Sequence, residues 1–343
     1  MTIAFEQLSR TPRLLLSARL EPVQGQRFQP TGFPDLGAAT YRAPVEPNGV
    51  RDMLLVESAQ SMANRLEAVT WDAAANDLAA PLKGLPYVVV VSEDGKPLTN
   101  SVLEAHRLNS PYILESGDRS FFERLKTELN AVSDGAVDLA QAARTVFKYD
   151  CGSVLHGVFL AKSELAGGRI RLTRLLSAFI EAEDAMPAES GGVKNDRLDP
   201  AGDTKSGFGN VPFHRVEYVA RKITAYFNLD LALLRSYGMG EAAEKLLIGL
   251  ALWKIRHFLE SSLRLRTACD LVCKEIAVDR PQGFELPSAA ALDSLLPELI
   301  AACRAQFAQP PVTRVTWRKP EAKGKRNRGA EAAEDDADEA DEQ

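Results

Sequence analysis

Three polar side chains follow one edge of a predicted amphipathic helix over residues 48–69, for which Asn48 is the expected N-cap. The apolar residues of this stretch recur every three or four positions, which puts them on one helix face. Ser58, Ser61 and Arg65 run along the margin of that face at the same spacing. Two hydroxyls and a guanidinium can together hold the phosphates of a nucleic acid. The pattern is equally typical of a core helix with a polar border, so the helix alone leaves both interpretations open.

The long connection before this helix, about residues 24–47, carries further groups of the same kind. A connection of this length in a compact domain is usually functional or disordered. Its side chains include Arg27, Gln29 and Thr31, with aromatic rings between them. Such groups suit single-stranded RNA, which needs phosphate contacts and flat surfaces for unstacked bases. Loops also use aromatic residues for packing, so direct contact with RNA is one of two interpretations.

A second glycine-rich stretch, about residues 185–214, is also predicted to be a long loop. It contains neither the GxxxxGK[ST] nor the GxGxxG pattern, so it gives no sign of a nucleotide site. The segment GGVKNDR could form a turn that presents Lys194 and Arg197 to phosphates. A basic loop that is merely solvated would have the same composition.

No arrangement of residues in the sequence predicts catalysis. The first loop has two acidic residues, Asp35 and Glu46, and a carboxylate such as Asp35 with no identified partner is weak evidence for nuclease chemistry. We find no nucleophile elbow, metal-ligand spacing or paired-carboxylate motif, and we expect no cofactor. Cys269 and Cys273 have no nearby cysteine or histidine pair to complete a zinc site. We therefore expect reduced thiols, a cytoplasmic protein and a binding role, not an enzyme.

The charge of the chain is divided unevenly. The net charge is −6, and removing the eight acidic residues between Glu331 and Glu342 changes it to +2. A mildly basic body is compatible with nucleic acid binding without demonstrating it. Residues 320–343 have almost no large apolar side chains, so we expect a disordered tail that starts basic and ends acidic. No apolar run of about 18 residues occurs, so we expect no membrane span.

Helices and strands are expected to alternate along residues 1–319, which we interpret as a single domain. Helices are predicted at residues 48–69, 121–129, 139–147, 241–258 and 288–307. Strands are predicted at residues 13–23, 86–91, 153–160, 169–181, 216–229, 263–278 and 312–317. This order suits an α+β sandwich of ferredoxin-like or RRM-like type, interrupted by the two long loops.

Four segments resemble one particular protein family. They are RFQPTGFPDLGAATY (residues 27–41), NGVRDMLLVESAQSMANRLE (48–67), GGVKNDRLDP (191–200) and GFGNVPFHRVEY (207–218). The sequence is similar to the backbone subunit of the type I-U CRISPR interference complex (Cascade), also called type I-G. That family is a divergent branch of the Cas-seven group within the RAMP superfamily. The resemblance extends from about residue 13 to about residue 278.

The resemblance implies both a fold and a role in antiviral defence. It implies an RRM-like palm, with insertions that form a thumb and accessory lobes. Copies of the chain would line up head to tail along the spacer of the guide RNA (crRNA) as a helical filament. Target DNA would be recognised by pairing with the guide. Further expected partners are a large subunit, a guide-processing subunit and a separate helicase-nuclease that cuts the DNA.

Eight residues are the candidate RNA contacts. They are Arg27, Gln29, Thr31, Ser58, Ser61, Arg65, Lys194 and Arg197. Two other functions remain as alternatives. One is a metal-dependent RNA endonuclease of the RAMP superfamily that uses Asp35, and the other is a scaffold that binds only proteins.

Overall fold

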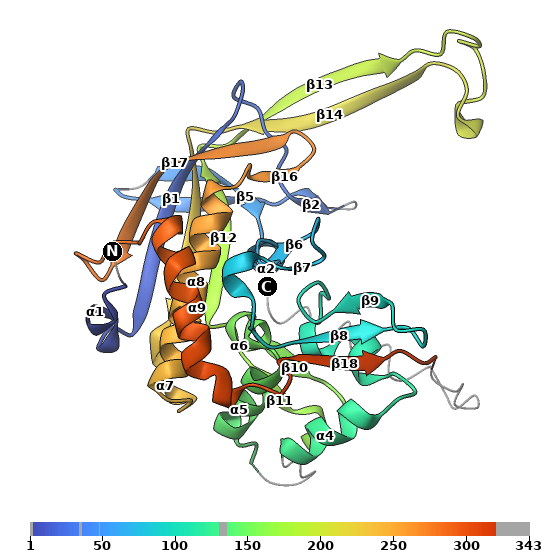
Figure 1. Ribbon diagram of the computed structural model, residues 1–343. Coiled ribbons are helices and arrows are strands. Elements are labelled where there is room, and N and C mark those ends of the chain that lie inside the picture. Colours follow the sequence, from blue (N-terminus) through green and yellow to red (C-terminus); the bar gives the residue numbers. More distant parts are fainter. Residues whose placement is uncertain (1–2, 34–35, 48, 130–135, 320–343) are drawn as a thin grey trace.

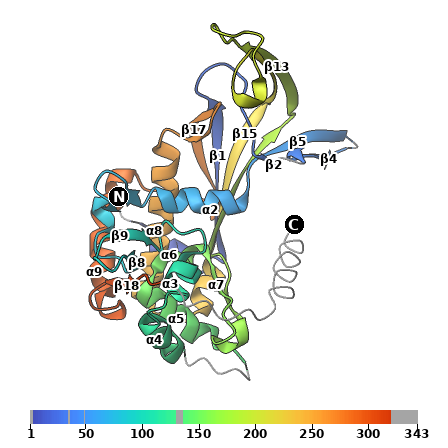
Figure 2. The ribbon, with the colours of Figure 1, turned by 90° about the vertical axis from the view of Figure 1, so that its right-hand side faces the viewer.

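The protein is described by a computed structural model that covers residues 3–33, 36–47, 49–129 and 136–319. Helices and strands both contribute largely to it (Figure 1). Three parts can be distinguished in Figure 1 and, turned by 90°, in Figure 2: a curled central sheet with helices against it, a smaller region below, and a long two-stranded arm that projects from the sheet. No helix of the described ranges is long and apolar enough to cross a membrane.

The central sheet has seven strands, and every neighbouring pair is antiparallel. In spatial order, the strands are β16 (Arg264–Arg266), β17 (Cys269–Arg280), β1 (Arg13–Pro22), β15 (Lys222–Asp230), β12 (Leu176–Glu183), β5 (Gly49–Glu57) and β4 (Thr40–Val45).

The sheet forms because alternate side chains along its strands are apolar. Leu14, Leu16, Ala18 and Leu20 of β1 are all buried and share one face, as the period of two predicts. Helix α8 (Glu241–Glu260) supplies the partner surface. Further helices around the sheet are α1 (Phe5–Ser9), α2 (Ala59–Ala68), α7 (Leu231–Ser236) and α9 (Ala289–Cys303), which packs against α8.

The smaller region is built on a three-stranded sheet, β18-β8-β9. Every residue of β8 (Tyr87–Val91) is buried, because β18 (Val312–Thr316) and β9 (Pro97–Asn100) flank it. Its other elements are α3 (Pro111–Leu114), α4 (Ser120–Glu128), α5 (Leu139–Tyr149), α6 (Cys151–His156) and the pair β10 (Val158–Leu160) and β11 (Ile170–Leu172). Two short hairpins elsewhere complete the strands: β2 (Gly32–Phe33) with β3 (Gly37–Ala38), and β6 (Trp71–Asp72) with β7 (Asp77–Leu78).

The arm corrects the prediction of a loop over residues 185–214. Strands β13 (Met186–Lys194) and β14 (Val211–Val219) pair along their whole length (Figure 1). The prediction was wrong because most side chains of both strands are at least partly exposed, so no apolar face alternates along the sequence. Only the tip, between Lys194 and Val211, is a connection.

The helix predicted over residues 48–69 is half strand. Residues up to Glu57 form β5, where Leu54 and Val56 are buried at a spacing of two. The helix α2 starts after Ser58, whose Oγ accepts a hydrogen bond from the Ser61 N–H at 3.2 Å. Ser58 is therefore the N-cap. The predicted cap Asn48 lies outside the described residues.

Other boundaries also differ from the predictions. The loop at residues 24–47 contains β2, β3 and β4. The strand predicted at residues 153–160 is helix α6 followed by β10, because Asp150 caps the helix by accepting two backbone N–H groups and Gly157 then turns the chain at φ +83°. The strands predicted at residues 169–181, 216–229 and 263–278 are each divided into two strands.

Several predictions are confirmed with small shifts of boundary: the strands β1, β8 and β18, and the helices α4, α5, α8 and α9. The tail at residues 320–343 lies outside the described residues.

Candidate nucleic-acid interface

The segment of residues 27–31 is fixed by backbone hydrogen bonds to the arm, to the turn before β17 and to β5. Phe28 exchanges two backbone hydrogen bonds with Tyr218 of β14, both 2.9 Å. The N–H of Gln29 donates to the carbonyl of Ala268 at 2.8 Å, and the N–H of Thr31 donates to that of Val56 at 3.0 Å. Three parts of the fold thus hold this short segment.

The side chains of the segment alternate between the core and the surface. Phe28 and Pro30 are buried, whereas Arg27 is exposed and Gln29 and Thr31 are half-buried. The alternation is that of a strand, so the three predicted contact residues share one side. The sequence-based grouping of Arg27, Gln29 and Thr31 is therefore a spatial one.

A buried carboxylate lies beside this segment, at the N-terminal end of α2. Glu57 is 1% exposed, and Arg65 Nε forms an ion pair with its carboxylate at 3.0 Å. Arg266 of β16 contacts the other carboxylate oxygen, and the Ser61 hydroxyl donates to Glu57 as well. Arg266 Nη1 also donates to the carbonyls of Gln29 and Val56, at 3.0 and 3.1 Å. Glu57 is thus the centre of a polar cluster that ties β5, α2, β16 and the extended segment together.

A second carboxylate, Glu217 of β14, holds two more arginines at the base of the arm. Arg27 Nη1 lies 3.6 Å from Glu217 and Arg215 Nε lies 3.5 Å from it. Arg215 also reaches the side-chain oxygen of Gln29, at 3.4 Å. We call the four arginines Arg27, Arg65, Arg215 and Arg266 the arginine seam.

The electrostatic balance of the seam is positive, because four guanidinium groups face only two carboxylates, Glu57 and Glu217. Arg27 is the most exposed of the four, with 57% of its side chain accessible, followed by Arg215 at 35%. Arg65 and Arg266 are 26% and 23% exposed and are largely occupied with Glu57 and backbone carbonyls. A nucleic acid phosphate would therefore meet Arg27 and Arg215 first, with the other two behind them.

Of the eight predicted RNA contacts, five lie at the arginine seam. The other three either serve another purpose or lie far from it. Gln29, Thr31, Ser61 and Arg65 surround the Glu57 cluster, and Arg27 lies beside them. Ser58 uses its hydroxyl as a helix cap. Lys194 and Arg197 are exposed near the tip of the arm, four strand positions or more from Arg215, which is about 13 Å along β14.

Sequence reasoning missed Glu57, Arg215, Glu217 and Arg266. Glu57 ends an apolar run, and a charge in such a position is a signal of a buried ion pair. Arg215 and Glu217 are two residues apart on one strand, which puts them on the same side. Nothing in the sequence pairs Arg266 with a glutamate 209 positions away.

A different charged cluster lies at the C-terminal end of α2 and is sealed. Glu67 forms a bidentate pair with Arg107, at 2.6 and 2.7 Å, and both side chains are nearly inaccessible. Lys254 of α8 is 2% exposed and lies beside a cavity of about 30 Å³ that Glu67 and Asp150 also line. Burial lowers the pKa of Lys254 to about 8.

His156 completes this cluster as a core residue, because it is fully buried. Its Nε2 lies 2.8 Å from the Lys254 nitrogen. Burial, and then the neighbouring Lys254, hold the pKa of His156 well below its ordinary value. The neutral ring can therefore accept a hydrogen bond from Lys254 through Nε2.

The residues that a nuclease would need are not gathered in the described part of the chain. Within it, no three histidine, cysteine or carboxylate side chains are placed to hold a metal ion together. Asp35 lies outside the described residues.

Residues 14–187, more than half of the chain, match a family model of CRISPR-associated proteins. The chain belongs to that family, whose description is CRISPR-associated protein GSU0053. No curated protein matches the sequence.

Chains of two solved structures show weak similarity to this chain. A chain of a "CRISPR RNA-guided surveillance complex, pre-nicking" is 13% identical, with a TM-score of 0.38, and the match covers 78% of this chain and 79% of that one. A chain of a "CRISPR RNA-guided surveillance complex" is also 13% identical, with a TM-score of 0.35, covering 82% and 74%. At these scores the similarity assigns no role to any residue.

Proposed function

We propose that this CRISPR-associated protein is the guide-RNA-binding backbone subunit of a type I-U/I-G interference complex. In this proposal the seven-stranded sheet and its helices are an RRM-like palm, and the arm of β13 and β14 is the thumb. Copies assemble head to tail along the spacer of the guide, which then pairs with target DNA. The protein itself is not an enzyme, and a separate helicase-nuclease cuts the DNA in the cytoplasm.

The observation that carries the proposal is the arginine seam. Its guanidinium groups are held in place by two carboxylates and by backbone carbonyls, so little side-chain entropy is lost when a phosphate binds. The groups are spread along an extended segment and the base of a projecting arm, which suits a chain of phosphates better than a single ion. Such contacts carry no base information, as a subunit that binds any spacer requires.

The proposal is tested first by purifying the protein from cells that carry a matching repeat–spacer array and sequencing any RNA that accompanies it. Discrete spacer-containing RNA in a large particle supports the proposal. A protein that carries no RNA, even with its partner subunits, and does not bind synthetic guide at low salt would overturn it.

The seam is tested by replacing Arg27 and Arg215 together with alanine. We expect weaker binding to single-stranded RNA, by a similar factor for unrelated sequences, and a salt dependence that is flatter by about 0.7 per lost phosphate contact. Fluorescence anisotropy over a salt series measures both quantities. The matched control is Arg314→Ala, which removes an exposed arginine from β18 in the smaller region. A loss confined to one RNA sequence, or an equal loss in the control, would contradict the assignment.

A further inference from the structure

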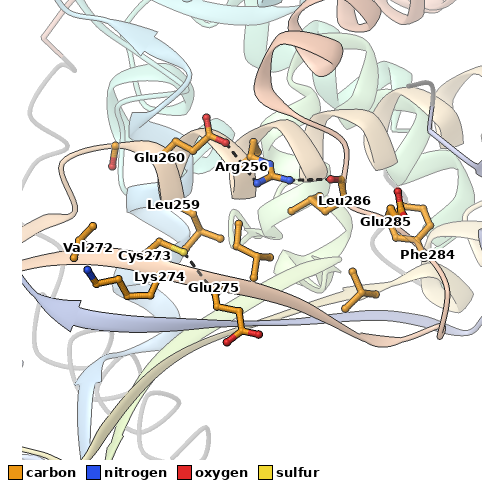
Figure 3. Close-up of a pocket in the computed structure, with 13 residues that line it drawn as sticks. Arg256, Leu259, Glu260, Val272, Cys273, Lys274, Glu275, Phe284, Glu285 and Leu286 are labelled. Carbon is orange, nitrogen blue, oxygen red and sulfur yellow. Dashed lines mark hydrogen bonds and ion pairs between the residues drawn. The ribbon is translucent and has the colours of Figure 1, made fainter.

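A groove of about 730 Å³ lies between the C-terminal end of α8 and strand β17. Figure 3 shows α8 along one wall, β17 along the other, and the segment with Phe284 and Leu286 at one end. None of the residues that line the groove belongs to the arginine seam. The groove is therefore a second surface, and nothing in the RNA-binding proposal uses it.

Strand β17 presents an open edge to this groove. It pairs with β1 from Leu271 to Arg280, whereas β16 on its other side pairs only with Cys269 and Asp270. Among the described residues, no strand is paired with the outer edge of β17 beyond that point. Residues 272–278 thus offer backbone N–H and C=O groups over roughly 20 Å, enough for about six residues of an added strand.

The groove side of β17 is apolar. Cys273, Ile276 and Val278 are opposite the buried β1 residues Leu20, Ala18 and Leu16, so they point towards α8. They remain half-buried because β17 is the edge, and Leu259, Phe284 and Leu286 add apolar lining. Most of the remaining lining is polar and includes Arg256, Glu260 and Glu285. The register shift at Lys274 sets Cys273 and Ile276 three residues apart, so the groove side of an added strand would meet an apolar stripe with one irregular step.

The opposite side of the same strand carries two carboxylates, and Arg19 of β1 lies across the strand pair from one of them, Glu275. Glu275 points away from α8 in Figure 3, and Asp279 is on the same side of β17. Within the described ranges, neither forms an ion pair with a lysine or arginine, although Asp279 accepts a hydrogen bond from Ser17 at 3.0 Å. The carboxylates disfavour an RNA backbone and favour basic side chains on the added strand.

The other edge of the sheet is protected. Strand β4 carries Pro44, which has no N–H to donate, so it resists extension of the sheet. Strand β17 contains no proline before Pro281. Of the two edge regions, only β17 therefore combines an open edge, a groove with an apolar stripe beside it and carboxylates on its other side.

From this combination we infer that β17 is a docking site for an extended segment of a partner protein. The segment adds a strand to the sheet at residues 272–278. It places alternate apolar side chains in the groove, and its intervening residues include lysine or arginine near Glu275 and Asp279.

The test uses the full-length protein and a defined probe. The probe is a fluorescent peptide with valine at every second position and lysine or threonine between, and a matched peptide carries N-methyl groups on alternate residues. Cys273 is an internal reporter, because it is half-buried in the groove while the other three cysteines are buried. We expect the unmodified peptide to bind, to protect the amides of residues 272–278 from hydrogen exchange and to slow maleimide labelling of Cys273 severalfold.

Charge reversal sharpens the test. Glu275→Lys should weaken binding of the peptide severalfold, whereas Glu298→Lys, an exposed position on α9, should leave it unchanged. Neither variant should alter RNA affinity, and the Arg27 and Arg215 variant should bind the peptide normally, so the two proposals fail separately. No binding at millimolar peptide, equal binding of the N-methylated peptide, or unchanged labelling of Cys273 would overturn the inference. Displacement of the peptide by single-stranded RNA would assign the groove to RNA instead.

Discussion

Each end of helix α2 has a buried glutamate paired with arginine, but the arginines at the two ends differ in their exposure to solvent. At its start, Glu57 is buried, but its arginine partners Arg65 and Arg266 keep about a quarter of their side chains accessible. Near its end, Glu67 and its partner Arg107 are both sealed from solvent. One cluster reaches the surface beside an extended segment, and the other is enclosed between α2, α6 and α8.

The difference in exposure separates what each cluster can do. Charges at the open end can exchange an internal partner for a phosphate, because water already reaches them and little new desolvation is needed. Charges at the sealed end cannot meet a ligand without opening the core. We therefore propose that the Glu57 end serves recognition and the Glu67 end stability, and three variants test that division.

The largest effect is expected from Arg107→Met. It leaves Glu67 buried without its main partner, which typically costs about 3–5 kcal/mol of unfolding free energy. Urea unfolding followed by circular dichroism measures the loss, and RNA affinity of the folded fraction should be unchanged. If the loss were no larger than that of Arg314→Met on the surface, the sealed cluster would not have the structural role assigned to it.

The next effect is a pH dependence that only the sealed end should show. The pKa of Lys254 is lowered from 10.5 in the unfolded chain to about 8 by burial. Between these values the unfolded chain binds more protons at this residue, so the contribution of Lys254 to stability rises with pH from about 8 to 10.5, by on the order of 3 kcal/mol. The buried thiols of Cys151, Cys269 and Cys303, whose pKa burial raises, act in the opposite direction, so the difference between the wild type and a Lys254 variant isolates the lysine. Lys254→Met should flatten this rise in a series of urea unfolding curves. An equally steep rise in the variant would show that another group is responsible.

The smallest change in stability is expected at the open end. Arg65→Ala removes a hydrogen bond to the Leu265 carbonyl and one partner of Glu57, while Arg266 remains. We expect a loss of about 1–2 kcal/mol in unfolding free energy. RNA binding should weaken by a similar factor for unrelated sequences, with a flatter salt dependence. Normal RNA binding at temperatures where the variant is folded would remove Arg65 from the interface and leave the contrast between the ends one of stability only.

The sequence was informative where one face of an element is buried. Strand β1 and helix α9 each carry an apolar pattern of the right period over their length, and each lies where it was predicted. Helix α8 also lies where it was predicted, although it is buried on all sides between Leu246 and Ile255. The prediction of one helix over residues 48–69 was wrong because the apolar run of β5 continues into α2 with spacings that also fit one long helix. Only the cap at Ser58 divides the two, and a serine in that position is equally compatible with the helix surface.

The candidate site was predictable in part for the same physical reason. Arg27, Gln29 and Thr31 alternate along the chain, so their common side follows from local geometry. The link from Glu57 to Arg266 depends on the curl of the sheet, which brings β16 over the start of α2. The arm had no signal at all, because a two-stranded ribbon that is exposed on both sides has no apolar period.

The pair of hydrogen bonds between Phe28 and Tyr218 has a mechanical consequence. Tyr218 belongs to the first paired positions of the arm, and Phe28 lies between two of the predicted RNA contacts. A sideways force on the tip of the arm would therefore act on these two hydrogen bonds at the arm's base. A tilt of the arm's base would shift Arg27 and Arg215 together. A force applied at the tip would thus change the geometry of the arginine seam.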